Sequence, residues 1–448
     1  MRADENDLLT RVGPGTKMGS LMRQYWLPAL KSDELVAGGD PVRLRLLGES
    51  FLAFRSPDGS VGIVDHLCAH RCASLFYGRN EEGGIRCVYH GWKFATDGQC
   101  VAMPSEPPET DYKERVKIAA AAVEERYGIV WAYIGPDNPP PPFSHFDFDL
   151  VPQEDISASF MMRECNWLQA LEGDIDTCHV GFLHLGGVQA QRFEKGSVDY
   201  YRQLPENLAP KYEAIEAPYG TTYVASRHAG PENLYHRIGH FAFPFWTMVP
   251  SDPLDTVRIK GWVPIDDMHV MLVQISGYDR SADPADKDGK KIAGTAIETP
   301  LLPNGTGWYE RFRIANNRGN DHLIDRKVQR ESSYSGIQGI AIQDQAITES
   351  MGFIVDRTKE HLGTSDRMIM LTRRRLMRAA LALAEQDVAP PGAEDVDVFR
   401  FTRAGPIVLP KETDWLEEYN RHRSEWSGGE AQPIERMARR TVESKADA

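Results

Sequence analysis

Residues Cys68–Trp92 read CAHRCASLFYGRNEEGGIRCVYHGW, with one cysteine and one histidine near each end of the stretch. The first pair is Cys68 with His70, and the second is Cys87 with His90. Two or three positions separate the members of each pair, which is the reach of a single loop that grips one metal centre. The stretch therefore predicts a metal site with two thiolate and two imidazole ligands.

Such a ligand set fits either a structural zinc ion or an iron–sulfur cluster. Structural zinc sites more often pair two cysteines in one box and two histidines in the other, whereas both boxes here are mixed. The mixed order suits a two-iron centre in which both thiolates bind one iron and both imidazoles bind the other, the Rieske [2Fe–2S] arrangement. The proline-bearing loop at residues 103–108 fits this interpretation, because such a loop can limit the exposure of a cluster to solvent.

The sequence around these boxes has the texture of an all-β domain. Short apolar runs alternate with turn dipeptides such as Asp97-Gly98, which is typical of antiparallel strands. The predicted strands cover residues 42–46, 51–54, 61–64 and 127–134. Prolines at 139–142 follow and indicate a boundary. We therefore expect residues 41–137 to form a domain inserted near the N-terminus of a larger one.

The rest of the chain mixes both types of secondary structure. Helices are predicted at 17–26 and 365–386, and strands at 241–249, 257–263 and 270–275. The predicted fold class is thus α+β, with an antiparallel sheet and helices over residues 138–448. We expect a helical lead-in, residues 1–40, to pack on this larger domain and a polar tail to end it.

Composition limits the possible functions. Of the 448 residues 41% are hydrophobic and 26% charged, an ordinary globular mix. The 65 acidic and 51 basic residues give a formal net charge of −14, which argues against nucleic acid and anionic membranes as partners. The first residues lead into no long apolar segment, and six cysteines are too few for a disulfide scaffold. We therefore expect a cytoplasmic protein.

A second group of candidate ligands lies in residues 166–184, which read NWLQALEGDIDTCHVGFLH. On an ideal helix Glu172, Asp176 and His179 share one face, whereas His184 lies about 140° away from His179. Both imidazoles reach one ion only if the helix ends or bulges at the intervening glycine. Two histidines and one carboxylate, local or remote, form the facial triad of non-haem Fe(II) oxygenases.

The two groups in this order resemble the large subunit of the Rieske non-haem iron oxygenases, most closely the phthalate 4,5-dioxygenase-like branch. The resemblance spans essentially the whole chain and implies an all-β Rieske [2Fe–2S] domain in front of a catalytic domain. Its further segments are residues 8–16, 25–29, 73–82, 243–245, 262–267, 343–344 and 349–352.

The resemblance also implies the role of each ligand. The implied metal ligands are Cys68, His70, Cys87 and His90 for the cluster and His179, His184 and Asp344 for a mononuclear iron. Asp176 matches the bridging aspartate of the family, which bonds the iron ligand His179 and meets His90 of the partner subunit. Such head-to-tail contacts must close into a ring, so we expect a homotrimer or a stacked pair of trimers.

The activity implied by the resemblance is oxygen insertion into an aromatic carboxylate such as a phthalate or a benzoate. A separate NADH-dependent reductase, with or without a ferredoxin, would supply the electrons, since the chain has no Gly-rich dinucleotide fingerprint. A carboxylate substrate needs a cation, ideally a bidentate arginine. The candidate substrate-binding residues are Arg237, Arg227 and Arg258.

Other functions stay open from the sequence alone. O-demethylation of a methoxylated aromatic acid would use the same iron sites. A Rieske electron-transfer protein would hold the cluster and no mononuclear iron, and a structural zinc protein would hold neither iron centre. Glu172 is the alternative to Asp344 as the carboxylate ligand.

Overall fold

The computed structural model describes residues 1–186, 203–277, 285, 288–292 and 294–436. The strands are β1 Leu27–Lys31, β2 Val42–Leu46, β3 Glu49–Arg55, β4 Val61–Asp65, β5 Arg79–Glu81, β6 Gly84–Arg86, β7 Lys93–Phe94, β8 Cys100–Ala102, β9 Ala122–Arg126, β10 Ile129–Tyr133, β11 Ser157–Arg163, β12 Lys211–Ala217, β13 Gly220–His228, β14 Asn233–Ala242, β15 Trp246–Met248, β16 Arg258–Pro264, β17 Val270–Ser276 and β18 Gly405–Pro410. The α-helices are α1 Ala3–Thr10, α2 Lys17–Met22, α3 Trp167–Ile175, α4 Gln203–Glu206, α5 Arg326–Glu331, α6 Ile340–Ser350, α7 Arg367–Gln386 and α8 Trp415–Trp426.

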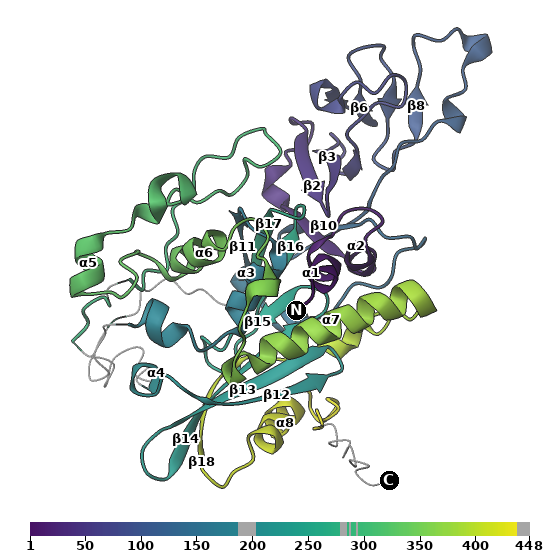
Figure 1. The fold of residues 1–448 in the computed structure, drawn as a ribbon. Helices are drawn as coiled ribbons and strands as arrows, with labels where there is room; N and C mark the ends of the chain where they lie inside the picture. The colour runs from purple at the N-terminus through teal and green to yellow at the C-terminus, as the bar shows by residue number, and fades with distance from the viewer. Residues whose placement is uncertain (187–202, 278–284, 286–287, 293, 437–448) are drawn as a thin grey trace, which may run out of the picture.

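Three small antiparallel sheets build the all-β domain, which projects from one end of the molecule (Figure 1). Their strand orders are β1-β10-β9, β2-β3-β4 and β5-β6-β7-β8. A separate apolar core lies beneath the boxes and includes Cys68, Cys87, Trp92 and Phe94. The lead-in is not purely helical, because β1 pairs with β10 and so joins the start of the chain to the end of this domain.

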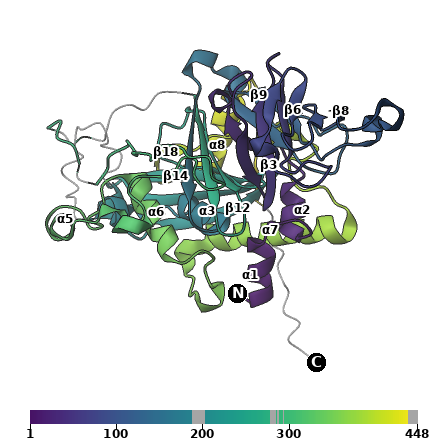
Figure 2. The ribbon, with the colours of Figure 1, turned by 90° about the horizontal axis from the view of Figure 1, so that it is seen from above.

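The larger domain is built on an eight-stranded antiparallel sheet of order β11-β17-β16-β15-β14-β13-β12, with β18 paired to β14. Helix α7 packs across β12 and β13 and also contacts α2 (Figures 1 and 2). Its buried side includes Met368, Ile369, Leu376 and Ala380, which cover the sheet. The predicted α+β class, with an all-β domain near the N-terminus and an antiparallel sheet with helices, is therefore confirmed.

Two predicted elements differ from the structure. The run at 241–249 is not one strand, because β14 ends at Ala242 and β15 begins only at Trp246. The predicted helix at 17–26 ends at Met22. Part of the expected polar tail is anchored, since Ile434 is 3% exposed and Arg436 pairs with Glu213 at 2.6 Å. Residues 437–448, the end of that tail, lie outside the described residues.

No helix within the described ranges combines the length and the apolar character that crossing a bilayer demands.

Candidate active site

The four predicted cluster ligands meet at the tip of the all-β domain. Cys68 and Cys87 are both buried, and burial raises the pKa of the Cys68 thiol to about 11. The rings of His70 and His90 lie 4.4 Å apart, centroid to centroid. Nδ1 of His70 is buried and has no hydrogen-bond partner among the described residues. Two adjacent buried thiols and an imidazole nitrogen without a protein partner fit a [2Fe–2S] cluster, whose positive irons stabilise the thiolates.

The loops that carry these ligands are closed by local contacts. The amide of Cys72 donates to the carbonyl of Cys68 at 2.9 Å, and the amide of Gly91 donates to that of Cys87 at 3.0 Å. Gly91 has φ +78°, and a Cβ there would lie 2.6 Å from Cγ of Pro104. The glycine therefore lets the proline-bearing loop approach the second box, and Trp92 fastens that loop by donating to the Ser105 hydroxyl at 3.2 Å.

The second group of ligands does not form one continuous helix. α3 ends at Ile175, and Asp176 is its C-cap with φ −90° and ψ 104°. A π-helical turn then runs over Val180–His184, with His179 at its N-cap. The prediction that Glu172, Asp176 and His179 share one helix face is therefore wrong. The predicted bulge between the histidines is present, and its wide turn brings positions five apart to the same side.

Three side chains from two distant segments converge on one point. Nε2 of His179 lies 3.1 Å from Nε2 of His184. Oδ1 of Asp344, on α6, lies 3.5 Å from the first nitrogen and 3.2 Å from the second. Ligand atoms at right angles around a metal about 2.1 Å away lie about 3 Å apart. The three atoms therefore have the spacing of a facial triad.

The remaining ring nitrogens are held by the protein. Nδ1 of His179 lies 3.5 Å from Oδ2 of Asp176, and Nδ1 of His184 lies 2.6 Å from Oε1 of Gln343. Nε2 of Gln343 donates to two backbone carbonyls, at 2.9 and 2.7 Å, so its oxygen must face the ring. Nδ1 of His184 is therefore protonated, and Nε2 presents a lone pair. Lone pairs and a carboxylate that face one another fit a bound cation.

The charges in this site shift one another's protonation. Burial would raise the pKa of Asp344, but the imidazoles of His184 and His179 hold it below its usual range. Burial would likewise raise the pKa of Asp176, but its contact with His179 lowers it, and the pKa lies below its usual range. Burial would lower the pKa of His179, yet Asp176 and Asp344 raise it. Both carboxylates are thus ionised at neutral pH, and their charge favours a cation at the point where Asp344 and the two Nε2 atoms converge.

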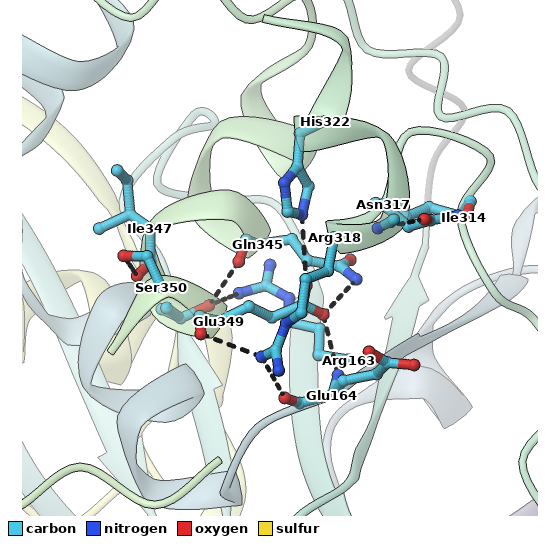
Figure 3. A network of polar contacts seen from close by, with 12 residues as sticks. Arg163, Glu164, Ile314, Asn317, Arg318, His322, Gln345, Ile347, Glu349 and Ser350 are labelled. Atoms are coloured by element: carbon cyan, nitrogen blue, oxygen red, sulfur yellow. Dashed lines mark hydrogen bonds and ion pairs between the residues drawn. The ribbon is translucent and has the colours of Figure 1, made fainter. Parts of the chain in front are cut away.

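A polar network fixes α6, the helix of the third ligand, to the end of β11 (Figure 3). Glu349 is 3% exposed and accepts hydrogen bonds from the backbone N–H of Glu164 at 2.8 Å and from Gln345 at 2.7 Å. His322 lies 3.2 Å from the same carboxylate. Arg318 donates to the carbonyls of Glu164 and Glu349, both at 3.0 Å. These supporting residues had no signal in the sequence, because Glu349 and Glu164 are 185 positions apart.

The triad opens onto a cavity of about 120 Å³ whose wall is mostly apolar. The apolar lining consists of Val180, Leu185, Tyr223, Val249, Ile292 and Ile340. Three cationic side chains also line it, namely Arg237, Arg258 and Lys260. Arg258 is paired with Asp252 at 2.5 Å and Lys260 with Asp174 at 2.8 Å. Arg237 is 2% exposed and donates from Nε to the Thr177 hydroxyl at 2.8 Å.

Arg227, the other predicted substrate-binding residue, is not part of this lining. It is 1% exposed, and its Nε donates to the backbone carbonyl of Asn207 at 2.9 Å. Burial, and then the charge of Arg237, lower its pKa to about 10. Arg227 therefore lies behind the cavity wall, where its charge acts on Arg237 without direct access to a ligand.

Glu172, the alternative third ligand, faces away from the histidines. It is 8% exposed and accepts from Arg357 at 3.0 Å and from Arg373 at 2.9 Å. Burial would raise the pKa of Glu172, but the two arginines lower it. Its carboxylate is consumed by buried ion pairs, so Asp344 is the carboxylate that the structure brings to the histidines.

Two family models match successive parts of the chain. The family model of the Rieske [2Fe–2S] domain matches residues 25–120. The family model described as LigXa C-terminal domain like matches residues 132–439.

Relatives match over nearly the full chain. The 3-chlorobenzoate-3,4-dioxygenase oxygenase subunit of Comamonas testosteroni is 43% identical, with 93% of this chain and 97% of that protein covered. The phthalate 4,5-dioxygenase oxygenase subunit of Pseudomonas putida is 33% identical, with 94% and 95% covered. A solved oxygenase–ferredoxin complex of carbazole 1,9a-dioxygenase shares the fold, with a TM-score of 0.50, 19% identity and 85% and 94% coverage. The chain therefore belongs to the Rieske non-haem iron oxygenases, as an oxygenase subunit of the branch that includes phthalate 4,5-dioxygenase.

Proposed function

We propose that this chain is the terminal oxygenase for an aromatic carboxylate of the benzoate or phthalate kind. One observation carries the substrate class: Arg237, 2% exposed, lines the same cavity as the histidines and Asp344. A buried guanidinium beside a metal site is the partner that a carboxylate needs. The names of the two relatives, dioxygenases of 3-chlorobenzoate and of phthalate, support the same class.

Among the three cations that line the cavity, Arg237 is our first candidate for binding the substrate carboxylate. Arg237 is 2% exposed, whereas Arg258 and Lys260, paired with Asp252 and Asp174, have side-chain exposures of 18% and 17%. Arg227, the other residue predicted from the sequence, would act on the substrate only through its charge. Its buried charge adds to the positive potential around Arg237 and so favours an anion there.

We assign His179, His184 and Asp344 to the mononuclear iron. Three ligands on one face leave the opposite positions open for O₂. When bound, the iron supplies the activation of O₂. Asp176 and Gln343 orient the two rings so that both Nε2 atoms face the iron. The apolar lining excludes water from the reacting centre and leaves the aromatic ring as the group beside the iron.

We assign Cys68, His70, Cys87 and His90 to the cluster, which supplies electrons one at a time. Exposed apolar side chains flank these ligands, with Val88 60% and Tyr89 55% exposed, as expected of a surface that docks on another chain. The side chain of Asp176 is 28% exposed although it holds a ligand of the deeper site.

These two surfaces support a bridge across a subunit boundary. Asp176 would join His179 to a cluster histidine of a neighbouring subunit in a head-to-tail homotrimer, single or stacked. The electrons would come from NADH through a separate reductase, directly or through a ferredoxin. The six cysteines, all within the described ranges, form no disulfide with one another, which supports a cytoplasmic location.

Metal analysis and a product assay test this function. Anaerobically purified protein should contain about three irons and two acid-labile sulfides per chain and show a Rieske EPR signal on reduction. With NADH and a reductase, benzoate, 3-chlorobenzoate or phthalate should give a cis-dihydrodiol. Formaldehyde from a methoxybenzoate would instead identify an O-demethylase. Two irons, and no O₂ consumption after Fe(II) is added, would identify an electron carrier, and zinc without colour would contradict the whole assignment.

A further inference from the structure

The hydroxyl of Tyr223 is a buried polar group in the wall of the active-site cavity. Tyr223 lines the cavity together with the iron-site residues and is 0% exposed. Among the described residues nothing hydrogen-bonds its hydroxyl. A buried hydroxyl without a partner costs free energy, so a protein that keeps one beside a ligand cavity has a reason to do so. Burial raises the pKa of Tyr223 well above its usual range, so the group stays a donor.

The β-sheet places Tyr223 beside Arg237. Tyr223 on β13 pairs with Gly239 on β14, and Ala225 pairs with Arg237. Side chains on directly opposed positions and their diagonal neighbours share one face of a sheet, so Tyr223 and Arg237 are diagonal neighbours. The charge of Arg237 acts on Tyr223 through this short separation.

Gly239 makes the space that the tyrosine ring fills. A Cβ at Gly239 would lie 2.6 Å from Cζ and from the hydroxyl oxygen of Tyr223. That distance is shorter than any van der Waals contact, so a side chain at 239 would displace the ring. The missing side chain thus leaves the space over β14 in which the ring and its hydroxyl lie, in the wall of the cavity.

The three acidic groups in the same wall are already engaged, and Asp344 lies 3.2 Å from His184 at the proposed iron site. Asp174 accepts from Lys260, Thr247 and Trp262, each at 2.8 Å. Asp176 holds His179 and accepts from the amide of Cys178 at 2.7 Å. A ligand that enters the cavity therefore finds the Tyr223 donor and the guanidinium of Arg237, and the matching acceptor is an anion.

We propose that Tyr223 donates a hydrogen bond to the carboxylate of the aromatic substrate, beside Arg237. One carboxylate oxygen accepts from the phenol and the other from the guanidinium, so the pair sets the orientation of the ring as well as its charge. This proposal rests on the proposed function and names the group, besides the arginine, that selects the acid.

Binding measurements with two isosteric probes test it. Dissociation constants for benzoate and for nitrobenzene, its uncharged isostere, are measured anaerobically on the iron-loaded enzyme. Tyr223→Phe should weaken benzoate binding by about 10- to 100-fold and change nitrobenzene binding less than about threefold. The matched control is Tyr235→Phe, which removes a buried hydroxyl on the same face of the sheet, opposite Arg227 and outside the cavity lining, and should change neither.

The outcomes separate this proposal from the one it rests on. Equal benzoate affinity in wild type and Tyr223→Phe overturns the role of the tyrosine and leaves the proposed function intact. An equal loss of affinity for benzoate and nitrobenzene also overturns it, because that pattern indicates altered packing of the cavity wall rather than recognition of the carboxylate. Wild-type protein that binds no aromatic acid overturns both proposals.

Gly239→Ala gives a second, independent test. It keeps the hydroxyl but displaces the ring, so benzoate should bind about as weakly as to Tyr223→Phe. In the double variant, the loss of benzoate affinity relative to nitrobenzene should be no larger than in the more affected single variant, because both changes remove the same interaction. Benzoate affinity unchanged by Gly239→Ala would contradict the proposal.

Discussion

Gln343 and His184 are joined by a 2.6 Å hydrogen bond between Oε1 and Nδ1, although 159 positions separate them in the chain. The next residue after Gln343 on α6 is Asp344, so one helix both supplies a ligand and orients another. The amide of Gln343 is itself fixed by two backbone carbonyls, and its side chain is fully buried. The iron site thus depends on how α6 docks against the π-helical turn that bears His184.

Replacing Gln343 with Leu should weaken iron binding at the mononuclear site by about 10- to 100-fold, because the ring of His184 loses the acceptor that fixes its orientation and tautomer. Fe(II) titration of protein stripped of its labile iron measures this. The control is Gln345→Leu, since Gln345 is also buried on α6 but bonds Glu349 instead of a ligand. The control should lose stability and keep its iron affinity. Equal affinities in wild type and Gln343→Leu would rule out the orienting role.

Asp344→Ala should deplete the mononuclear iron and leave two irons and two sulfides in the cluster. Glu172→Gln, the matched change at the other candidate carboxylate, should keep all three irons. It should instead lower the free energy of unfolding by up to about 3 kcal/mol, because the buried Arg357 and Arg373 lose one of their two counter-ions and keep only Glu360. Metal analysis and denaturant unfolding of both variants decide the matter; the reverse pattern of iron loss would make Glu172 the ligand.

The cluster boxes could be predicted from the sequence because each is a local loop. Cys68 and His70, like Cys87 and His90, lie two or three residues apart, so their spacing alone indicates a shared centre. The same reasoning misplaced Glu172 on the histidine face, because α3 ends at Ile175 and an ideal helical wheel no longer holds beyond it.

The supporting residues of the site could not be predicted in this way. The role of Gln343, which precedes Asp344, arises from the packing of α6 against His184, and that of Tyr223 arises from strand register. Asp344 could be reached only through the family resemblance. Arg227 and Arg237 looked equivalent in sequence, yet their cross-strand partners are Tyr235 and Ala225, and only Arg237 reaches the cavity.

The burial of His240 leads us to expect that the folded protein loses stability in acid. It is fully buried among Tyr219, Thr222 and Tyr419, and burial lowers its pKa to about 3. In the unfolded chain the imidazole takes up its proton near pH 6.5, whereas in the folded protein it does so only near pH 3. The contribution of the neutral, buried His240 to the free energy of unfolding is therefore fully present above pH 6.5. It is lost as the pH falls from there toward 3, by up to about 1.4 kcal/mol per pH unit.

His240→Asn isolates this contribution, since an amide keeps a donor and an acceptor but does not titrate. The variant should be less stable at pH 7 and show a shallower decline between pH 6.5 and 4.5, measured by denaturant unfolding at each pH. Parallel profiles for the two proteins would assign the acid lability to other groups.

The proposed bridge through Asp176 predicts that the path of electrons crosses between chains. Asp176→Asn should keep three irons per chain but slow reoxidation of the reduced cluster by O₂ by about 10- to 100-fold, because the amide cannot hold two imidazolium-like N–H groups as a carboxylate does. Stopped-flow absorbance of anaerobically reduced protein reports that rate directly. Reoxidation at the wild-type rate would remove the bridging role.

Mixed assemblies show whether the bridge joins two subunits. His90→Ala, which lacks a working cluster, and Asp344→Ala, which lacks the iron, are each inactive alone. In a head-to-tail ring their co-expression should restore part of the activity, because the cluster of the second chain faces the iron of the first. Adding Asp176→Asn to the His90→Ala chain should abolish that rescue, whereas adding it to the Asp344→Ala chain should not. No rescue at all would place the electron path within one subunit. Rescue that ignores which chain carries Asp176→Asn would show a path that crosses between subunits without using Asp176.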